Sequence, residues 1–98
     1  MINESAVKTG RYIGKKLLEA SKTTSTQKQE RFLYPASLAL EGTKKQIGRI
    51  PDEIDRLLTW RDVNLGIDLE IASDGSKEYQ KASKIRALYQ KLLRKLDL

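Results

Sequence analysis

Lysines recur at helical spacing near the C-terminal end of the chain, and this is the pattern that most directly suggests chemistry. The ridge comprises Lys77, Lys81, Lys84, Lys91 and Lys95. At about 100° per residue, an α-helix would place all five within roughly 40° of one line. Each lysine is a mobile point charge that needs no fixed geometry to meet a phosphate. The ridge therefore predicts contact with the backbone of a nucleic acid.

A shorter basic stripe lies near the N-terminal end. Lys8, Arg11, Lys15 and Lys22 share one side of a predicted helix, with Glu19 inside the stripe. Lysine outnumbers arginine in both patterns, whereas the arginine fork is preferred where proteins recognise bases. The predicted partner is thus DNA or RNA, bound without sequence preference.

A lysine-rich face can also be a helix face that only meets solvent, and this is the alternative interpretation of the ridge. Solvated faces usually mix both signs of charge. Here Glu78 is the only acid of the predicted helix before Asp97. Neighbouring lysines repel one another by a few tenths of a kcal/mol, on the order measured for like-charge pairs in isolated helices. We take that repulsion as an argument for a bound polyanion.

The net charge of +6 is unevenly distributed along the chain. Residues 1–40 carry a net charge of +4, residues 41–74 carry −3, and residues 75–98 carry +5. Two basic ends therefore flank an acidic middle. Such segregation favours a polyanionic partner for the ends.

Catalytic chemistry has few candidates in this chain. It contains no His and no Cys, so a catalytic triad, a thiol nucleophile and a thiolate metal site are all excluded. Asp68, Glu70 and Asp74 lack the glycine and terminal glutamate of a calcium loop. A second acidic cluster consists of Asp52, Glu53 and Asp55. It lies at the start of the helix predicted over residues 51–61, where acidic side chains stabilise the helix dipole. We expect no enzyme activity, no cofactor, no metal site and no small-molecule substrate.

The length of 98 residues and the apolar content of 39% predict one domain spanning residues 1–98. Capping residues and apolar spacing predict helices over residues 4–22, 27–47, 51–61 and 77–96. The fold class is therefore mainly α, a small bundle of about four helices. Pro35 predicts a break or sharp kink in the second helix, because proline lacks the N–H donor and crowds the preceding turn.

Local signals add detail to these helices. Asn3 or Ser5 can cap the first helix, and Thr26 with Gln29 has the spacing of a capping box for the second. Gly10 and Gly14 lie four residues apart on the apolar side of the first helix. Each costs roughly 1 kcal/mol of helix propensity relative to alanine, so they predict the close approach of another backbone.

Residues 63–71 follow a different pattern, because apolar and polar residues alternate over the whole segment. Alternation with a period of two is typical of a strand. A single strand would need a partner from this chain or from another one. A hairpin, an extended connector and a helix surrounded by apolar contacts are the alternatives.

A second functional hypothesis rests on protein–protein contacts. Ala82, Ile85, Tyr89, Leu92 and Leu96 form an apolar seam with a heptad rhythm over two heptads. Together with the strand-like segment, this seam could serve self-association, an adaptor or an inhibitor. An inhibitor of a nucleic-acid enzyme could use the acidic segment 52–74 as a polyanion mimic. The chain shows no signal peptide and no membrane-spanning run, so we expect a cytoplasmic location.

Overall fold

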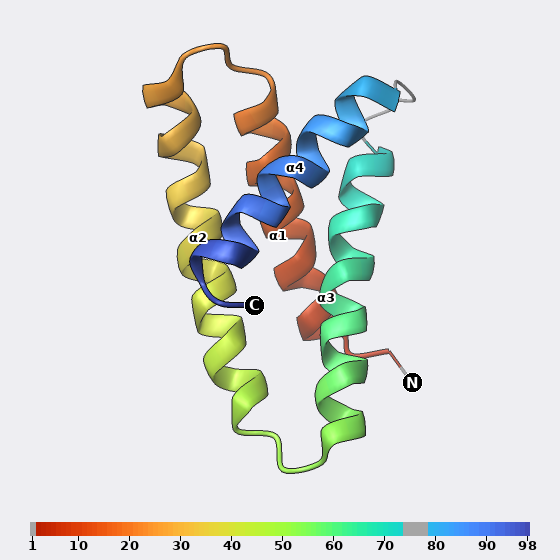
Figure 1. Cartoon of the computed structure of the whole chain (residues 1–98). Helices are drawn as coiled ribbons and strands as arrows, with labels where there is room; N and C mark the ends of the chain where they lie inside the picture. The colour runs from red at the N-terminus through yellow and green to blue at the C-terminus, as the bar shows by residue number, and fades with distance from the viewer. Residues whose placement is uncertain (1, 74–78) are drawn as a thin grey trace.

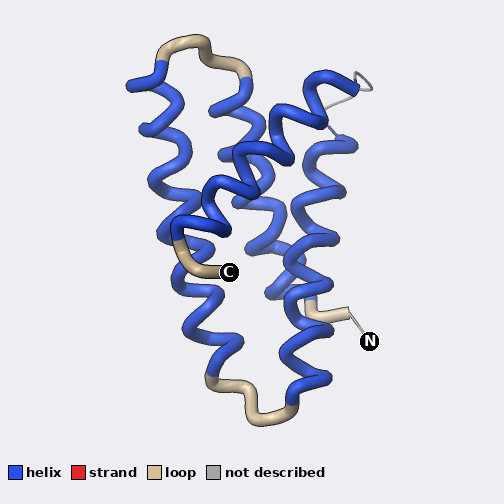
Figure 2. The backbone as a smooth tube through the Cα atoms, viewed as in Figure 1, coloured by secondary structure: helices blue, strands red, loops and turns tan. Residues whose placement is uncertain are grey.

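Four α-helices make up the part of the chain that the computed structural model describes, which is residues 2–73 and 79–98 (Figure 1). Side chains are described for residues 2–73 and 83–98. The helices are α1 (Glu4–Ser21), α2 (Thr26–Gly48), α3 (Glu53–Ser73) and α4 (Tyr79–Lys95). No strand occurs in these residues (Figure 2). The prediction of a mainly α, four-helix bundle is confirmed, and the strand predicted at 63–71 is wrong.

Helix α1 is the centre of the bundle. The chain reverses direction between α1 and α2 and again between α2 and α3, and α4 then crosses α1 obliquely (Figure 1). Helix α1 packs most extensively against α3, next against α2, and also against α4. Each helix contributes at least one fully buried aliphatic side chain to the shared core: Ile13, Leu17, Leu40, Val63 and Ile85.

The contact between α1 and α3 is so close that only glycine fits at its centre. A Cβ atom on Gly10 would overlap the carbonyl oxygen of Val63 and lie 3.0 Å from the Cα of Gly66. A Cβ atom on Gly66 would overlap the carbonyl oxygen of Val7 and lie 3.0 Å from the Cα of Gly10. One turn further along, a Cβ atom on Gly14 would lie 3.1 Å from the carbonyl oxygen of Ile67. The close helix crossing predicted from Gly10 and Gly14 is confirmed.

The start of α1 is capped by Asn3, and a hydrogen bond of the same residue attaches it to α3. The side chain of Asn3 caps α1 by accepting from the Ala6 N–H at 3.1 Å. The Asn3 N–H in turn donates to Asp62 Oδ2 at 2.8 Å. That bond, together with Arg61, holds the pKa of the buried Asp62 carboxyl below its ordinary value of 3.8, although burial acts in the opposite direction. Of the two predicted caps, Asn3 is the correct one.

Helix α2 continues through Pro35, so the predicted break is wrong. A proline inside a helix costs about 3 kcal/mol. Leu33 and Leu40 lie on either side of it and are both buried against the core. Burial of one leucine side chain contributes roughly 1.5–3 kcal/mol, which offsets the cost. The cap of α2 is Ser25, whose side chain accepts from the Lys28 N–H, and not the predicted Thr26.

Helix α3 includes the residues of the predicted strand. It begins at Glu53, where Asp52 Oδ1 accepts from the Ile54 N–H at 2.8 Å, and it extends to Ser73 and not to residue 61 as predicted. In a helix, alternate residues are about 200° apart, so a period of two places apolar side chains on two opposite sides. Val63 is buried, whereas Leu65 is exposed. Of the alternatives to a strand, the helix is the correct one, but apolar contacts cover it on one side only, where Val63 and Ile67 are buried.

Helix α4 uses its apolar seam to cover the bundle. Ile85 and Leu92 are buried, while Tyr89 and Leu96 are half-buried against the core. Ala82 lies in α4, but its side chain is outside the described residues. The described part of the seam is thus used within the fold.

The glycine contact generates a prediction about stability. Gly10→Ala would force α1 away from the Val63 carbonyl, and such overpacking should lower the unfolding free energy by about 2–3 kcal/mol. Gly42→Ala in α2 is the matched control, because a Cβ atom at that position would meet open space. Alanine in that exposed helix interior should raise the unfolding free energy by about 1 kcal/mol. Urea denaturation measures both, and equal changes in the two variants would contradict the prediction.

Candidate nucleic-acid interface

The predicted lysine ridge of α4 is largely engaged within the protein where the structure describes it. Lys84 Nζ donates to the Ser21 carbonyl oxygen at 3.0 Å. Lys91 Nζ lies 3.6 Å from Glu30 Oε1 on α2. Lys95 is exposed at the end of α4. Lys77 lies outside the described residues, and so does the side chain of Lys81.

These two contacts give the ridge a role in the fold. Ser21 is the last residue of α1, and its carbonyl belongs to the helix end that carries a partial negative charge. The Lys84 ammonium satisfies that carbonyl and joins α4 to α1. Lys91 joins α4 to α2, although both partners of this pair are more than half exposed and the ion pair contributes little. Repulsion along the ridge is therefore balanced in part by partners inside the protein.

The basic stripe of α1 differs from the ridge. Lys8, Arg11 and Lys15 are exposed, and none of them forms a hydrogen bond or ion pair with a residue that the structure describes. We call these three residues the basic line. Lys22 is also exposed but has an interaction of its own near the end of α1.

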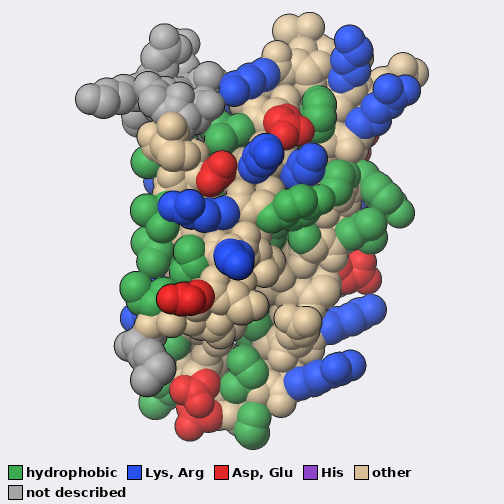
Figure 3. Space-filling model, turned by 180° about the vertical axis from the view of Figure 1, so that it is seen from behind, with side chains coloured by type: hydrophobic (Ala, Val, Ile, Leu, Met, Phe, Trp, Pro, Cys, Tyr) green, Lys and Arg blue, Asp and Glu red, His purple; other side chains and the backbone are tan. Residues whose placement is uncertain are grey.

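The basic line faces away from α4. Helix α4 crosses the face of the bundle seen in Figure 1, whereas basic side chains gather over the middle of the opposite face in Figure 3. The α1 stripe and the α4 ridge come together near the end of α1, where Lys84 donates to the carbonyl of Ser21, the residue before Lys22. Two acids, Glu4 and Glu19, lie close to the line on α1, and Glu19 pairs with Lys16 at 3.5 Å.

Exposed aromatic and apolar side chains border the basic line on the side of α2. Tyr12 and Leu38 line the same shallow groove between α1 and α2, together with Lys8. Tyr34 precedes Leu38 by one helical turn and is 66% exposed. Lys16 Nζ lies 5.7 Å from the centre of the Tyr12 ring, within the range of a cation–π contact. Sequence reasoning missed these tyrosines, although Tyr34 falls outside the apolar spacing of α2 and could have been recognised as exposed.

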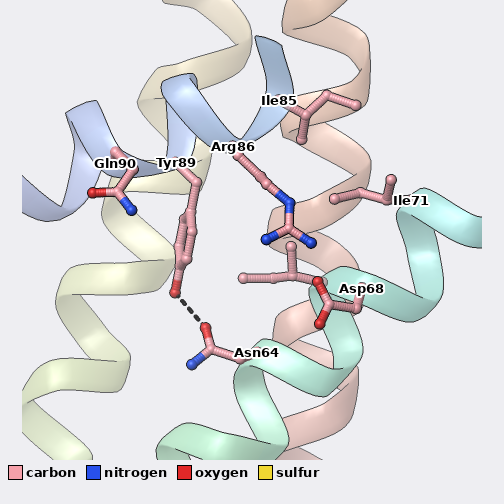
Figure 4. Close-up of a pocket in the computed structure, with 8 residues that line it drawn as sticks. Asn64, Asp68, Ile71, Ile85, Arg86, Tyr89 and Gln90 are labelled. Carbon is pink, nitrogen blue, oxygen red and sulfur yellow. Dashed lines mark hydrogen bonds between the residues drawn. The ribbon is translucent and has the colours of Figure 1, made fainter. Parts of the chain in front are cut away.

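A cleft of about 260 Å³ separates α3 from α4 (Figure 4). Tyr89 donates to Asn64 Oδ1 at 2.8 Å across it. Burial, and to a smaller extent the charge of Asp68, raises the pKa of Tyr89 to about 12. The Arg86 guanidinium extends toward Asp68, but neither forms a hydrogen bond or ion pair among the described residues. The hydrogen bond from Tyr89 to Asn64 therefore joins α4 to α3 across the cleft.

The acidic middle of the chain has structural partners in two places. Asp52 accepts from the first turn of α3, and Asp62 accepts from Asn3 and Arg61. Within the described residues, no group of three or more Asp or Glu side chains is arranged to hold a metal ion. No helix in the same part of the chain is long and apolar enough to cross a membrane.

Comparison of this chain with models of protein families, with curated proteins and with solved structures finds no match.

The Tyr89 contact predicts a pH-dependent stability. The unfolded phenol loses its proton near pH 10, whereas the folded one keeps it up to about pH 12. The resulting stabilisation is complete below pH 10 and is lost as the pH rises through 12. Tyr89→Phe should remove this part of the pH dependence of unfolding and a step near pH 12 in the phenolate absorbance titration. If the step that disappears lies near pH 10, the proposed environment of Tyr89 is wrong.

Proposed function

We propose that this protein binds nucleic acid without sequence preference through the basic line on α1. The observation that carries the proposal is that Lys8, Arg11 and Lys15 are exposed in one line and lack partners among the described residues. Lys8 and Lys15 are separated by two helical turns, or about 10 Å at 1.5 Å per residue. That distance corresponds to about three phosphates of a duplex strand, which rise by roughly 3.4 Å each.

The exposed tyrosines favour single-stranded nucleic acid as the ligand. An unpaired base can stack on an aromatic ring whatever its identity, and a basic groove can hold the adjoining phosphates. Tyr12 lines the same groove as Lys8, and Tyr34 is exposed on α2 one turn before Leu38, which also lines that groove. The overall charge of +6 adds long-range attraction to any polyanion.

The other predicted contacts have a secondary part in this proposal. Lys84 and Lys91 would have to leave their partners in order to meet a phosphate. Lys22 and Lys95 lie at the ends of their helices and could extend the contact of a longer strand. The protein then acts by binding and not by catalysis, in the cytoplasm, where nucleic acid is available.

Neutralising the basic line tests the proposal. The variant Lys8→Gln, Arg11→Gln, Lys15→Gln should lower the affinity for a labelled single-stranded oligonucleotide and reduce the log–log salt slope by about two units, since each phosphate contact contributes roughly 0.7. Tyr12→Ala should weaken single-strand binding by about tenfold and duplex binding less, because stacking is worth roughly 1–3 kcal/mol per base. Fluorescence anisotropy at several salt concentrations measures both effects.

The matched control is Lys28→Gln, Arg49→Gln, Arg94→Gln, because none of these residues belongs to the basic line or to the predicted ridge. It removes the same charge from exposed positions at the ends of α2 and α4. This control should keep most of the salt slope. Equal losses in the two triple variants would show that only net charge matters, and wild-type protein that fails to bind at low salt would refute the proposal.

A further inference from the structure

The outer side of α3 carries a row of aliphatic side chains that the fold does not cover. Five of them are 36–66% exposed: Ile54, Leu57, Leu58, Leu65 and Leu69. Hydrophobic side chains line the edge of the molecule at which α3 lies in Figure 3. Most of the row is opposite the side that packs against α1, where Val63 and Ile67 are buried. We call this row the outer face of α3.

A helix that is apolar on two opposite sides is typical of one that is covered on both. Single exposed leucines are ordinary on a protein surface, but a contiguous apolar row marks an interaction site. Helix positions 58, 65 and 69 fall within about 40° of one another at 100° per residue, so Leu58, Leu65 and Leu69 form one strip. This strip is long enough to receive another helix.

Two charged residues beside the strip indicate that the helix that packs on it is α3 of a second copy. Arg61 and Asp68 lie on the same border of the strip, seven residues apart, with Leu65 between them. Both are exposed, and Asp68 has no hydrogen bond or ion pair with a described residue. Arg61 contacts the neighbouring Asp62 at 3.1 Å and keeps more than half of its side chain exposed.

If two copies of α3 pack about a two-fold axis near Leu65, the charged and apolar residues of one copy face complementary residues of the other. In an antiparallel pair of helices, the same border of each helix meets across the interface, so Arg61 of one copy faces Asp68 of the other, twice. Leu65 then packs near Leu65 of the second copy, and Leu58 packs near Leu69 and Ala72. A two-fold interface requires such a self-complementary patch.

We propose that the protein forms an antiparallel homodimer through the outer face of α3, with Leu65 at its centre. A contact made by one helix from each copy falls at the lower end of the areas of specific interfaces. The dimer should therefore dissociate in the micromolar range. None of the residues involved belongs to the basic line, so this inference stands independently of nucleic-acid binding.

Sedimentation velocity of the full chain between about 10 µM and 1 mM, a range that covers weak association, tests the dimer. Wild-type protein should shift from 11.2 kDa toward twice that mass as its concentration rises. Leu65→Glu should remain monomeric and folded, since its side chain is exposed. Leu38→Glu is the matched control, because it makes the same exchange at an exposed leucine of α2 and should dimerise as the wild type does.

A charge exchange tests the antiparallel arrangement. Asp68→Arg and Arg61→Glu should each be monomeric alone, because like charges would face each other across the axis. An equimolar mixture should restore the dimer, because opposite charges then meet at both ends. Wild-type protein that is monomeric at 1 mM, Leu65→Glu that dimerises normally, or folded charge variants that do not pair on mixing would each overturn the proposal. If Arg61→Glu fails to fold, as judged by circular dichroism, the comparison of Leu65→Glu with Leu38→Glu still decides it.

Discussion

The direct backbone contact between α1 and α3 is the constraint on which the rest of this structure depends. Gly10 and Gly66 face each other so closely that neither can carry a Cβ atom without displacing the other helix. The two glycines lower the helix propensity of both segments, by roughly 1 kcal/mol each. Close packing of the surrounding aliphatic side chains, such as Ile13 and Val63, compensates for that loss.

This contact decides which surfaces the molecule presents. With α3 on one side, α2 on another and α4 crossing over it, α1 keeps only one narrow exposed side, and that side carries the basic line. Helix α3 uses its glycine-containing side for α1, which leaves its second apolar side facing outward. Helix α4 packs the described part of its seam against the core, and polar contacts of Lys84, Tyr89 and Lys91 attach it to the other helices. The two proposed binding surfaces are therefore consequences of one packing arrangement.

Local signals predicted much of this fold, and the errors have a common physical origin. Capping residues and apolar spacing located the helices, and Gly10 and Gly14 correctly predicted a close crossing, because these effects act over a few residues. The period of two at 63–71 is ambiguous, since a helix with two apolar sides produces the same pattern as a strand. The partners of Lys84 and Lys91 are 63 residues away at Ser21 and 61 away at Glu30, so no local pattern could identify them.

The two proposed surfaces would reinforce each other energetically if both act as proposed. Three phosphate contacts on one short helix give only weak binding, because non-specific affinity grows with the number of phosphates neutralised. A dimer through α3 would carry two basic lines on one particle, and the second contact of a long strand would then be intramolecular. Because the outer face of α3 lies on the side of that helix away from α1, pairing would leave both basic lines exposed. Dimerisation would thus convert a weak electrostatic contact into a stronger one without any additional residue on α1.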